Sequence, residues 1–318
     1  MQSAVVVIAI KEFRDIFRTK TFVIILGLLF FMSMVTVILG SAQVHQKVDA
    51  YQKSIEFLKS LGRTELPPMP NLNPIAVSKN FVNYIGMIGA LLAMILGYNA
   101  ISKERKNGTL TLILSRPIYR DQLINGKILG NVMVLLTILV VIGGSTIAFI
   151  NLTSGVTLTS TEIIKIILFF GMSLLYLLIF FALAFWMTIK IPQKNNAILL
   201  TIIIWLVVAF IFPQVGDTMD LDNQLPGGFF AQMGMTKTQE KQVVSKFHWY
   251  ETVRDGIEEM SPTKHYERMS FALLGIKPEF IDNTPLEVVK LKWLNLVGLT
   301  IPTLILLILS YVEFLKKS

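Results

Sequence analysis

Six long windows of this 318-residue sequence contain no Asp, Glu, Lys or Arg, and they constrain the fold more than any other feature. About 20 mostly apolar residues cross the hydrocarbon core of a bilayer, and one charge at the centre of such a helix costs about 2.5–3.5 kcal/mol. Hydrophobic residues make up 53% of the chain and charged residues 16%, unlike a soluble globular protein. The sequence therefore predicts an all-α membrane protein built as a single domain over residues 1–318.

The predicted transmembrane helices are about 21–41, 81–101, 128–150, 163–189, 197–213 and 293–315. We expect Pro213 to end the fifth one early, because proline breaks a helix interior. Lys and Arg set the orientation, since cytosolic loops carry an excess of positive charge. With both termini in the cytosol, the cytosolic segments hold fourteen basic residues against five acidic ones. We therefore predict cytosolic termini and a multi-pass protein of the cytoplasmic membrane of a prokaryote.

Several segments outside the spans have a helical pattern of their own. Residues 4–20 place apolar and basic side chains on opposite sides, which is typical of a helix that lies in the membrane interface and turns into the first span. Ordinary basic flanking of a span would be the simpler interpretation. The outer loops 42–80 and 214–292 contain apolar residues at helical spacing, as in 43–61 and 236–260, so we expect a small helical cap.

Residues 102–127, between the second and third spans, form a basic loop patterned as two short amphipathic helices broken at Arg116 and Pro117. Leu110, Ile113 and Leu114 form an apolar face on the first of these helices. A solvated connection with snorkelling Lys and Arg is the alternative. A simple connection between antiparallel spans needs only a handful of residues, however, and this loop has more than twenty.

Three runs of residues carry a family resemblance. They are K-E-F-R-D-x-x-R-x-K near the N-terminus, E-R-K-N-G-T-L-x-L-x-L-S-R-P-I-x-R-x-x-x-x-x-G-K in the basic loop, and M-S-P-T-K-H-Y at residues 260–266. Together they resemble the ABC-2-type permeases, the transmembrane subunits of ABC transporters. The likeness is greatest to the branch linked with multicopper-enzyme maturation and with drug or peptide export. It covers nearly the whole chain.

The resemblance implies one half of an export machine. Two permeases, identical or homologous, would face each other, each on a cytosolic ABC ATPase, and the basic loop would be the coupling helix that docks on that ATPase. Charged residues would pair across the docking surface, and the apolar face would enter a groove. The residues carried over for ATPase coupling are Glu104, Arg105, Lys106, Gly108, Thr109, Leu110, Ile113, Leu114, Ser115, Arg116, Pro117 and Arg120.

The chain itself is not predicted to be an enzyme. It lacks the G-x-x-x-x-G-K-[ST] pattern that cradles nucleotide phosphates. We expect this chain to bind no cofactor, and we place ATP and magnesium at the partner ATPase. No cysteine is present, and three histidines lie far apart in sequence, so no catalytic residue and no metal site is predicted. The acidic run Asp217, Asp220 and Asp222 has an incomplete calcium-loop spacing and reads as a solvated loop.

Polar residues in the second span are candidates for lining a transport pathway: Asn83, Tyr84, Tyr98 and Asn99. Hydrogen bonding between packed helices is the alternative role for them. Two functions remain open. One is export of a hydrophobic, peptide-like or drug-like substrate, and the other is a mechanotransmitting or regulatory subunit that relays ATPase motion to an outer-face protein without moving cargo. Basic residues at membrane edges favour the lipid bilayer over nucleic acid as a partner.

Overall fold

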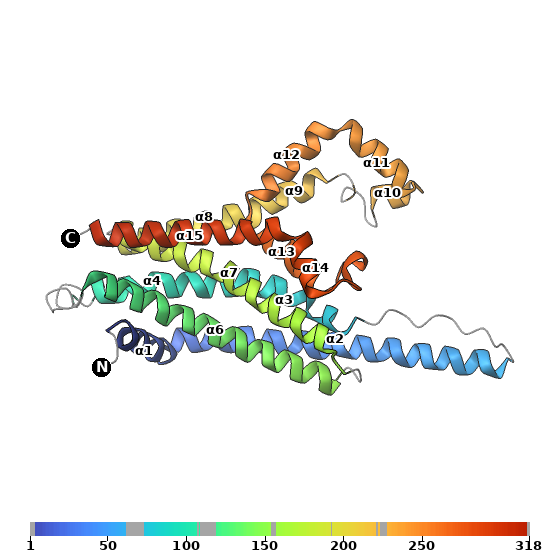
Figure 1. Ribbon diagram of the computed structural model, residues 1–318, viewed down its shortest axis with the longest axis horizontal. Coiled ribbons are helices and arrows are strands. Elements are labelled where there is room, and N and C mark those ends of the chain that lie inside the picture. Colours follow the sequence, from blue (N-terminus) through green and yellow to red (C-terminus); the bar gives the residue numbers. More distant parts are fainter. Residues whose placement is uncertain are drawn as a thin grey trace.

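The computed structural model describes residues 4–61, 73–106, 108, 119–153, 157–191, 193–220, 222 and 228–316, and its elements in these ranges are helices (Figure 1). Six stretches are long and apolar enough to cross a membrane. They are Phe22–Ser60, Ile75–Lys106, Arg120–Thr153, Ser160–Lys190, Asn196–Met219 and Trp293–Lys316. The predicted all-α fold with six candidate spans is therefore confirmed.

The α-helices are α1 (Ala4–Phe17), α2 (Lys20–Ser60), α3 (Lys79–Tyr84), α4 (Ala90–Lys106), α6 (Arg120–Thr153), α7 (Ser160–Lys190), α8 (Lys194–Leu206), α9 (Phe212–Met219), α10 (Phe229–Gln232), α11 (Lys237–Lys246), α12 (His248–Glu259), α13 (Pro262–Leu273), α14 (Pro285–Leu291) and α15 (Trp293–Lys316). Two π-helical turns lie inside spans: Ile85–Gly89 joins α3 to α4, and Val207–Ile211 joins α8 to α9. Short 3-10 turns occupy Pro74–Ser78 and Pro278–Phe280.

Helix α7 is the centre of the bundle. It packs against α4, α15, α13, α6 and α8, and it crosses the middle of the view in Figure 1. Phe180, Phe181 and Phe185 on this helix are fully buried. A helix that is apolar all round must be covered by other helices or by lipid, and α7 is the span with the largest buried share.

The bundle has two distinct ends. At one, which we call the loop end, lie both chain termini, the residues that flank 107–118, and the turn between α7 and α8 (Figure 1). At the other, the cap end, α9 to α14 gather, and α11 and α12 arch away from the bundle. Lys165 of α7 anchors the cap by donating to the carbonyls of Phe280 (3.4 Å) and Ile281 (3.0 Å).

Several helix limits differ from the sequence-based expectation. Helix α2 runs without a break from Lys20 to Ser60, so the first span and the first outer helix are one element. No proline interrupts this stretch, so the backbone hydrogen bonds continue past the apolar segment. The outer helix expected over 236–260 is divided at Phe247, whose ψ of 30° lies outside the helical range.

We expected Pro213 to end the fifth span early, but the helix continues beyond it. The π-helical turn Val207–Ile211 immediately precedes it, and α9 begins at Phe212 and continues to Met219. Because the helix is continuous here, the missing N–H of Pro213 removes one donor from its backbone ladder, and the Ser261 hydroxyl donates to the Val208 carbonyl in this turn (2.6 Å). The wider turn thus allows the helix to pass through Pro213.

Close contact between α4 and α7 generates a stability prediction. A Cβ atom on Gly97 would lie 2.3 Å from the carbonyl oxygen of Phe181 and 3.0 Å from the Cβ of Ala184. We expect Gly97→Leu to lower the free energy of unfolding by about 1–3 kcal/mol or more, because the backbones must separate. Thermal unfolding in detergent measures the effect. Gly171→Leu on α7 is the matched control, since nothing lies within 4 Å of its added Cβ. Equal stability of the two variants would contradict the close packing.

Candidate functional site

The basic loop begins and ends at the loop end, where α4 stops at Lys106 and α6 starts at Arg120. Gly108 has φ of +67°, a conformation that favours glycine. The side chain of Lys106 is exposed and that of Arg120 is half-buried. The other residues expected to contact an ATPase lie outside the described residues, so their docking role stays a prediction: Thr109, Leu110, Ile113, Leu114, Ser115, Arg116 and Pro117.

A buried ion cluster lies at the base of this loop. The Nζ of Lys127 on α6 is 2.8 Å from Oε1 of Glu104 on α4 and 2.9 Å from Oε1 of Glu12 on α1. It also donates to the carbonyl of Ala100 (2.7 Å). The side chain of Lys127 is only 1% exposed, and the side chains of Glu12 and Glu104 are 12% and 10% exposed. One ammonium group therefore joins three helices; we call this group, Glu12, Glu104 and Lys127, the ion clamp.

Two glycines allow α1 to reach the ion clamp. A Cβ on Gly126 would lie 2.7 Å from the Cβ of Ile8, and one on Gly130 would lie 2.7 Å from the carbonyl oxygen of Ala9. These glycines are four residues apart on α6, so they form one flat strip along which α1 lies. Lys127 follows Gly126 directly. Small residues thus bring the two helices close enough for Glu12 to reach the ammonium group.

Arg105 is tied to a fourth helix. Its guanidinium donates to the carbonyl oxygens of Thr188 (2.9 Å) and Ile191 (3.2 Å), at the C-terminal end of α7. The last carbonyls of a helix lack intrahelical partners and carry partial negative charge, which a cation satisfies. Glu104 and Arg105 therefore both make contacts within the chain, one on each side of α4. Whether they also pair with an ATPase stays a prediction.

Sequence reasoning did not select Glu12 or Lys127 as functional residues. Both lie inside the family-like runs, Glu12 in K-E-F-R and Lys127 in the closing G-K. The spacing alone did not reveal their pairing, because they are 115 positions apart and meet only through the crossing of α1 and α6. A charged residue inside an otherwise apolar stretch next to glycine was the available signal.

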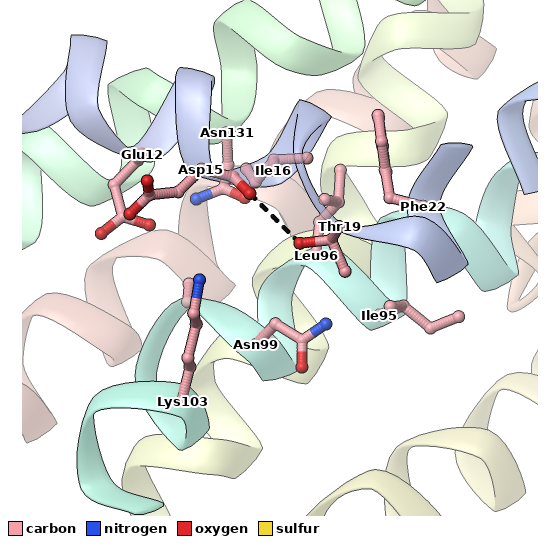
Figure 2. A pocket seen from close by; sticks show the side chains of 11 residues that line it. Glu12, Asp15, Ile16, Thr19, Phe22, Ile95, Leu96, Asn99, Lys103 and Asn131 are labelled. Atoms are coloured by element: carbon pink, nitrogen blue, oxygen red, sulfur yellow. Dashed lines mark hydrogen bonds between the residues drawn. The ribbon is translucent and has the colours of Figure 1, made fainter. Parts of the chain in front are cut away.

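A polar hollow of about 150 Å³ lies beside the ion clamp (Figure 2). Glu12 and Asp15 of α1, Asn99 and Lys103 of α4, and Asn131 of α6 line it, together with apolar side chains. In Figure 2 the Lys103 ammonium points across the hollow toward the α1 carboxylates. The structure thus brings one predicted pathway residue, Asn99, to a polar hollow at the loop end.

A partly uncovered edge runs along α3 and α4 from this hollow to the cap end. Exposed or half-buried residues recur at every fourth position: Asn83, Met87, Leu91, Ile95, Asn99 and Lys103. Asn83 lines a second hollow at the cap end. Tyr84 and Tyr98 flank this edge and are half-buried. The four predicted pathway residues therefore fall on one side of the second span, with Asn83 and Asn99 at opposite ends of it.

Asp217, Asp222 and His265 at the cap end make contacts within the chain. Asp217 pairs with Lys264 (2.6 Å), and the Asp222 carboxylate accepts from the backbone N–H of Phe230 (3.2 Å). His265 contacts the Asn295 amide oxygen through Nδ1 (3.0 Å) and the carbonyl of Glu259 through Nε2 (2.9 Å). Within the described ranges, no group of three His, Cys, Asp or Glu side chains is arranged to hold a metal ion.

The ion clamp makes a stability prediction. Lys127→Met should lower the free energy of unfolding by about 3–5 kcal/mol, because two nearly buried carboxylates lose their shared cation. Chemical denaturation in mixed micelles measures the change. Adding Glu104→Gln and Glu12→Gln should recover part of the loss, whereas exposed Lys106→Met should have almost no effect. If Lys127→Met and Lys106→Met unfolded alike, the clamp would not be stabilising.

The sequence matches one known protein family and two curated proteins. The model of the family described as ABC-2 family transporter protein matches residues 6–318. A probable ABC transporter permease protein NosY of Pseudomonas aeruginosa is 32% identical over 123 residues, which are 38% of this chain and 44% of that protein. The protein of the same name in Stutzerimonas stutzeri is 32% identical over 130 residues, 39% of this chain and 45% of the relative.

These alignments cover less than half the length of the two curated relatives. The family match, by contrast, extends over nearly the whole chain, through all six candidate spans. A permease of this family is a transmembrane subunit and not itself an ATPase, which agrees with the absence of a phosphate-binding loop motif in the sequence. The chain belongs to the ABC-2 family of transporter proteins, as a multi-pass membrane permease.

Proposed function

We propose that this chain is the permease of an ABC exporter, works as a dimer, and is driven through residues 102–127 by ATP hydrolysis in separate cytosolic ATPase subunits. The observation that carries the proposal is the ion clamp at the base of that loop. A push on the loop reaches α4 and α6 first, and Lys127 connects both to α1. Arg105 adds the end of α7. Four helices would therefore respond together.

The contacts of the ion clamp transmit force because they are nearly buried. A salt bridge in water breaks and reforms at little cost, so it transmits force poorly. Lys127 is 1% exposed and holds three oxygen partners within 2.9 Å. Pulling it away from either carboxylate would leave an uncompensated charge in a region of low dielectric. The helices at the loop end should therefore move as one body when an ATPase closes.

The open edge of α3 and α4 supports export as the outcome of that motion. Its ends are polar, at Asn83 and at Asn99 with Lys103, and its middle is apolar, at Leu91 and Ile95. Two such edges facing each other across a dimer seam would form a path with polar mouths and an apolar centre. A hydrophobic, peptide-like or drug-like molecule with a polar group suits such a path.

A specific feature also favours the alternative, in which ATPase motion is relayed to an outer-face protein. Helix α12 turns charged residues inward: Arg254 contacts Asp220 on the α9 side (3.8 Å). Its outward face carries Trp249 (70% exposed) and Val253, and Met260 (64% exposed) follows at its C-terminal end. Exposed apolar faces of this kind commonly bind a partner. The two functions share the same energy input and differ in whether anything crosses the membrane.

Docking on the ATPase can be tested through the apolar loop face. Leu110→Asp or Leu114→Asp should reduce co-purification of a co-expressed ATPase subunit at least tenfold, because a carboxylate cannot enter an apolar groove without a large desolvation cost. Arg14→Gln, an exposed position on α1, is the control that should leave the yield unchanged. Full ATPase recovery with both loop variants would refute docking through this face.

Export and relay can be separated with single cysteines, since the natural sequence has none. In the permease–ATPase complex, Asn99→Cys should react with a membrane-impermeant maleimide without nucleotide, and Asn83→Cys should react only after vanadate trapping with ATP. We expect each reaction rate to change at least fivefold between these states, because the path opens to one side at a time. Leu199→Cys, on the outward face of α8, is the control for lipid exposure. Unchanged reactivity at both asparagine positions would favour the relay.

A further inference from the structure

The second hollow, at the cap end, combines an apolar wall with a carboxylate, a combination that transport by itself does not explain. Its volume is about 170 Å³, and it lies between the second span, the fifth span and α13. Met87, Phe210 and Pro213 give it an apolar lining, and Asn83, Thr263 and Glu267 add polar groups. A small recess with an apolar wall and a few convergent polar groups is the usual form of a ligand site.

The two π-helical turns shape this hollow and are held in place by outside hydroxyls. The wider turn at Ile85–Gly89 leaves the Gly86 carbonyl to accept from the Tyr176 hydroxyl (3.0 Å). The turn at Val207–Ile211 leaves the Val208 carbonyl to accept from the Ser261 hydroxyl (2.6 Å), at the start of α13. Such turns frequently occur at functional sites. Here each one has its freed carbonyl satisfied, so the walls of the hollow are preformed.

Tyr266 lines the hollow, and its ring stacks on that of Tyr176 behind it. The ring centroids of Tyr176 and Tyr266 lie 4.5 Å apart, and both side chains are fully buried. The Tyr266 hydroxyl is 3.0 Å from the hydroxyl of Ser173, and that of Tyr176 is 3.2 Å from Thr263. Both phenols therefore have polar partners, and neither needs a ligand. This tyrosine pair therefore adds no charge to the hollow.

Charge is not balanced around Glu267. Lys264 lies 2.6 Å from Asp217 and 3.7 Å from Glu258, and Arg268 pairs with Glu258. Lys264 and Arg268 thus pair with Asp217 and Glu258. Among the described residues, Glu267 forms no ion pair. Burial raises the pKa of the Glu267 carboxyl above its ordinary value, since it removes water from the charged form; Lys264 and Arg268 lower it, and the nearby Asp217 and Glu258 carboxylates raise it further. A cation entering the hollow would supply the missing charge.

We propose that this hollow binds an organic ammonium group, with the Glu267 carboxylate as its counter-ion and the apolar wall around its carbon body. A simple metal ion fits less well, since it would need several oxygen ligands and the lining supplies one carboxylate. An ammonium group that carries a small ring gains burial against Met87 and Pro213, and it can lie beside the face of Phe210. An anion is repelled by Glu267.

This inference concerns binding, so it stands apart from the proposed export and does not need the ATPase. Benzylammonium is a suitable probe, because it combines a primary ammonium with a ring that the hollow can enclose. The full chain in nanodiscs of phosphatidylglycerol, a lipid without an ammonium group, is titrated and followed by saturation-transfer NMR. We expect benzylammonium to bind at least tenfold more tightly than benzyl alcohol, which has the same body without charge.

Two variants test the assigned residues. Glu267→Gln should abolish the preference for benzylammonium over benzyl alcohol, whereas Glu259→Gln, an exposed carboxylate at the end of α12, should preserve it. Met87→Trp should fill the hollow from an exposed position and weaken both probes, without touching the ion pairs around Glu258. Unaltered thermal unfolding of each variant shows that the fold is intact. No preference in the natural chain, or a preference that survives Glu267→Gln, would overturn the proposal.

The same chemistry could come from a free amine or from the ammonium of a lipid headgroup. Repeating the titration in nanodiscs that contain phosphatidylethanolamine separates these sources. If the lipid occupies the site, the affinity of the natural chain for benzylammonium should fall several-fold, because the two ammonium groups compete. If a free amine is the ligand, the affinity should stay the same. In both cases Glu267 is the counter-ion, and the result tells whether a lipid headgroup or a free amine carries the ammonium group.

Discussion

The ammonium group of Lys127 is the interaction on which the loop end of this protein depends. It is almost entirely buried, yet it joins Glu12 of α1, Glu104 of α4 and the backbone of Ala100 from its place on α6. Such a group is tolerated at the edge of a membrane only when its charge is matched nearby. Here the matching negative charges come from two different helices, α1 and α4. The need to neutralise Lys127 therefore fixes where these two helices lie against α6.

Backbone proximity makes that arrangement possible. Gly126 and Gly130 bring α1 onto α6, and Gly97 brings α4 onto α7, with added Cβ atoms meeting neighbours at 2.3–2.7 Å. In lipid, helices gain little from apolar burial against each other, so close van der Waals packing and polar contacts must hold them together. The glycines and the ion clamp therefore act together: the first allow the approach that the second requires.

Part of this structure could be predicted from local chemistry. The six spans follow from charge-free windows, and the helix start at Thr284 follows from its capping box, whose Glu287 side chain accepts from the Thr284 backbone N–H. The continuous α2, the passage of the helix through Pro213 and the two π-helical turns could not be predicted. The π-helical turns involve contacts made elsewhere in the chain, such as the Ser261 hydroxyl that donates to the Val208 carbonyl. Glu104 and Arg105 were predicted to matter, but their contacts within the chain were not predicted.

By itself, the sequence determined that this chain is a helical membrane protein with six candidate spans and a basic loop, because burial in lipid is a property of composition along one segment. The sequence motifs also indicated the ABC-2 family, and the family match over residues 6–318 agrees with them. Only the tertiary structure decided which charges neutralise each other, and that Glu267 forms no ion pair with the other described residues around it. Pairing between residues far apart depends on helix crossings, and those crossings are set by packing that no local pattern encodes.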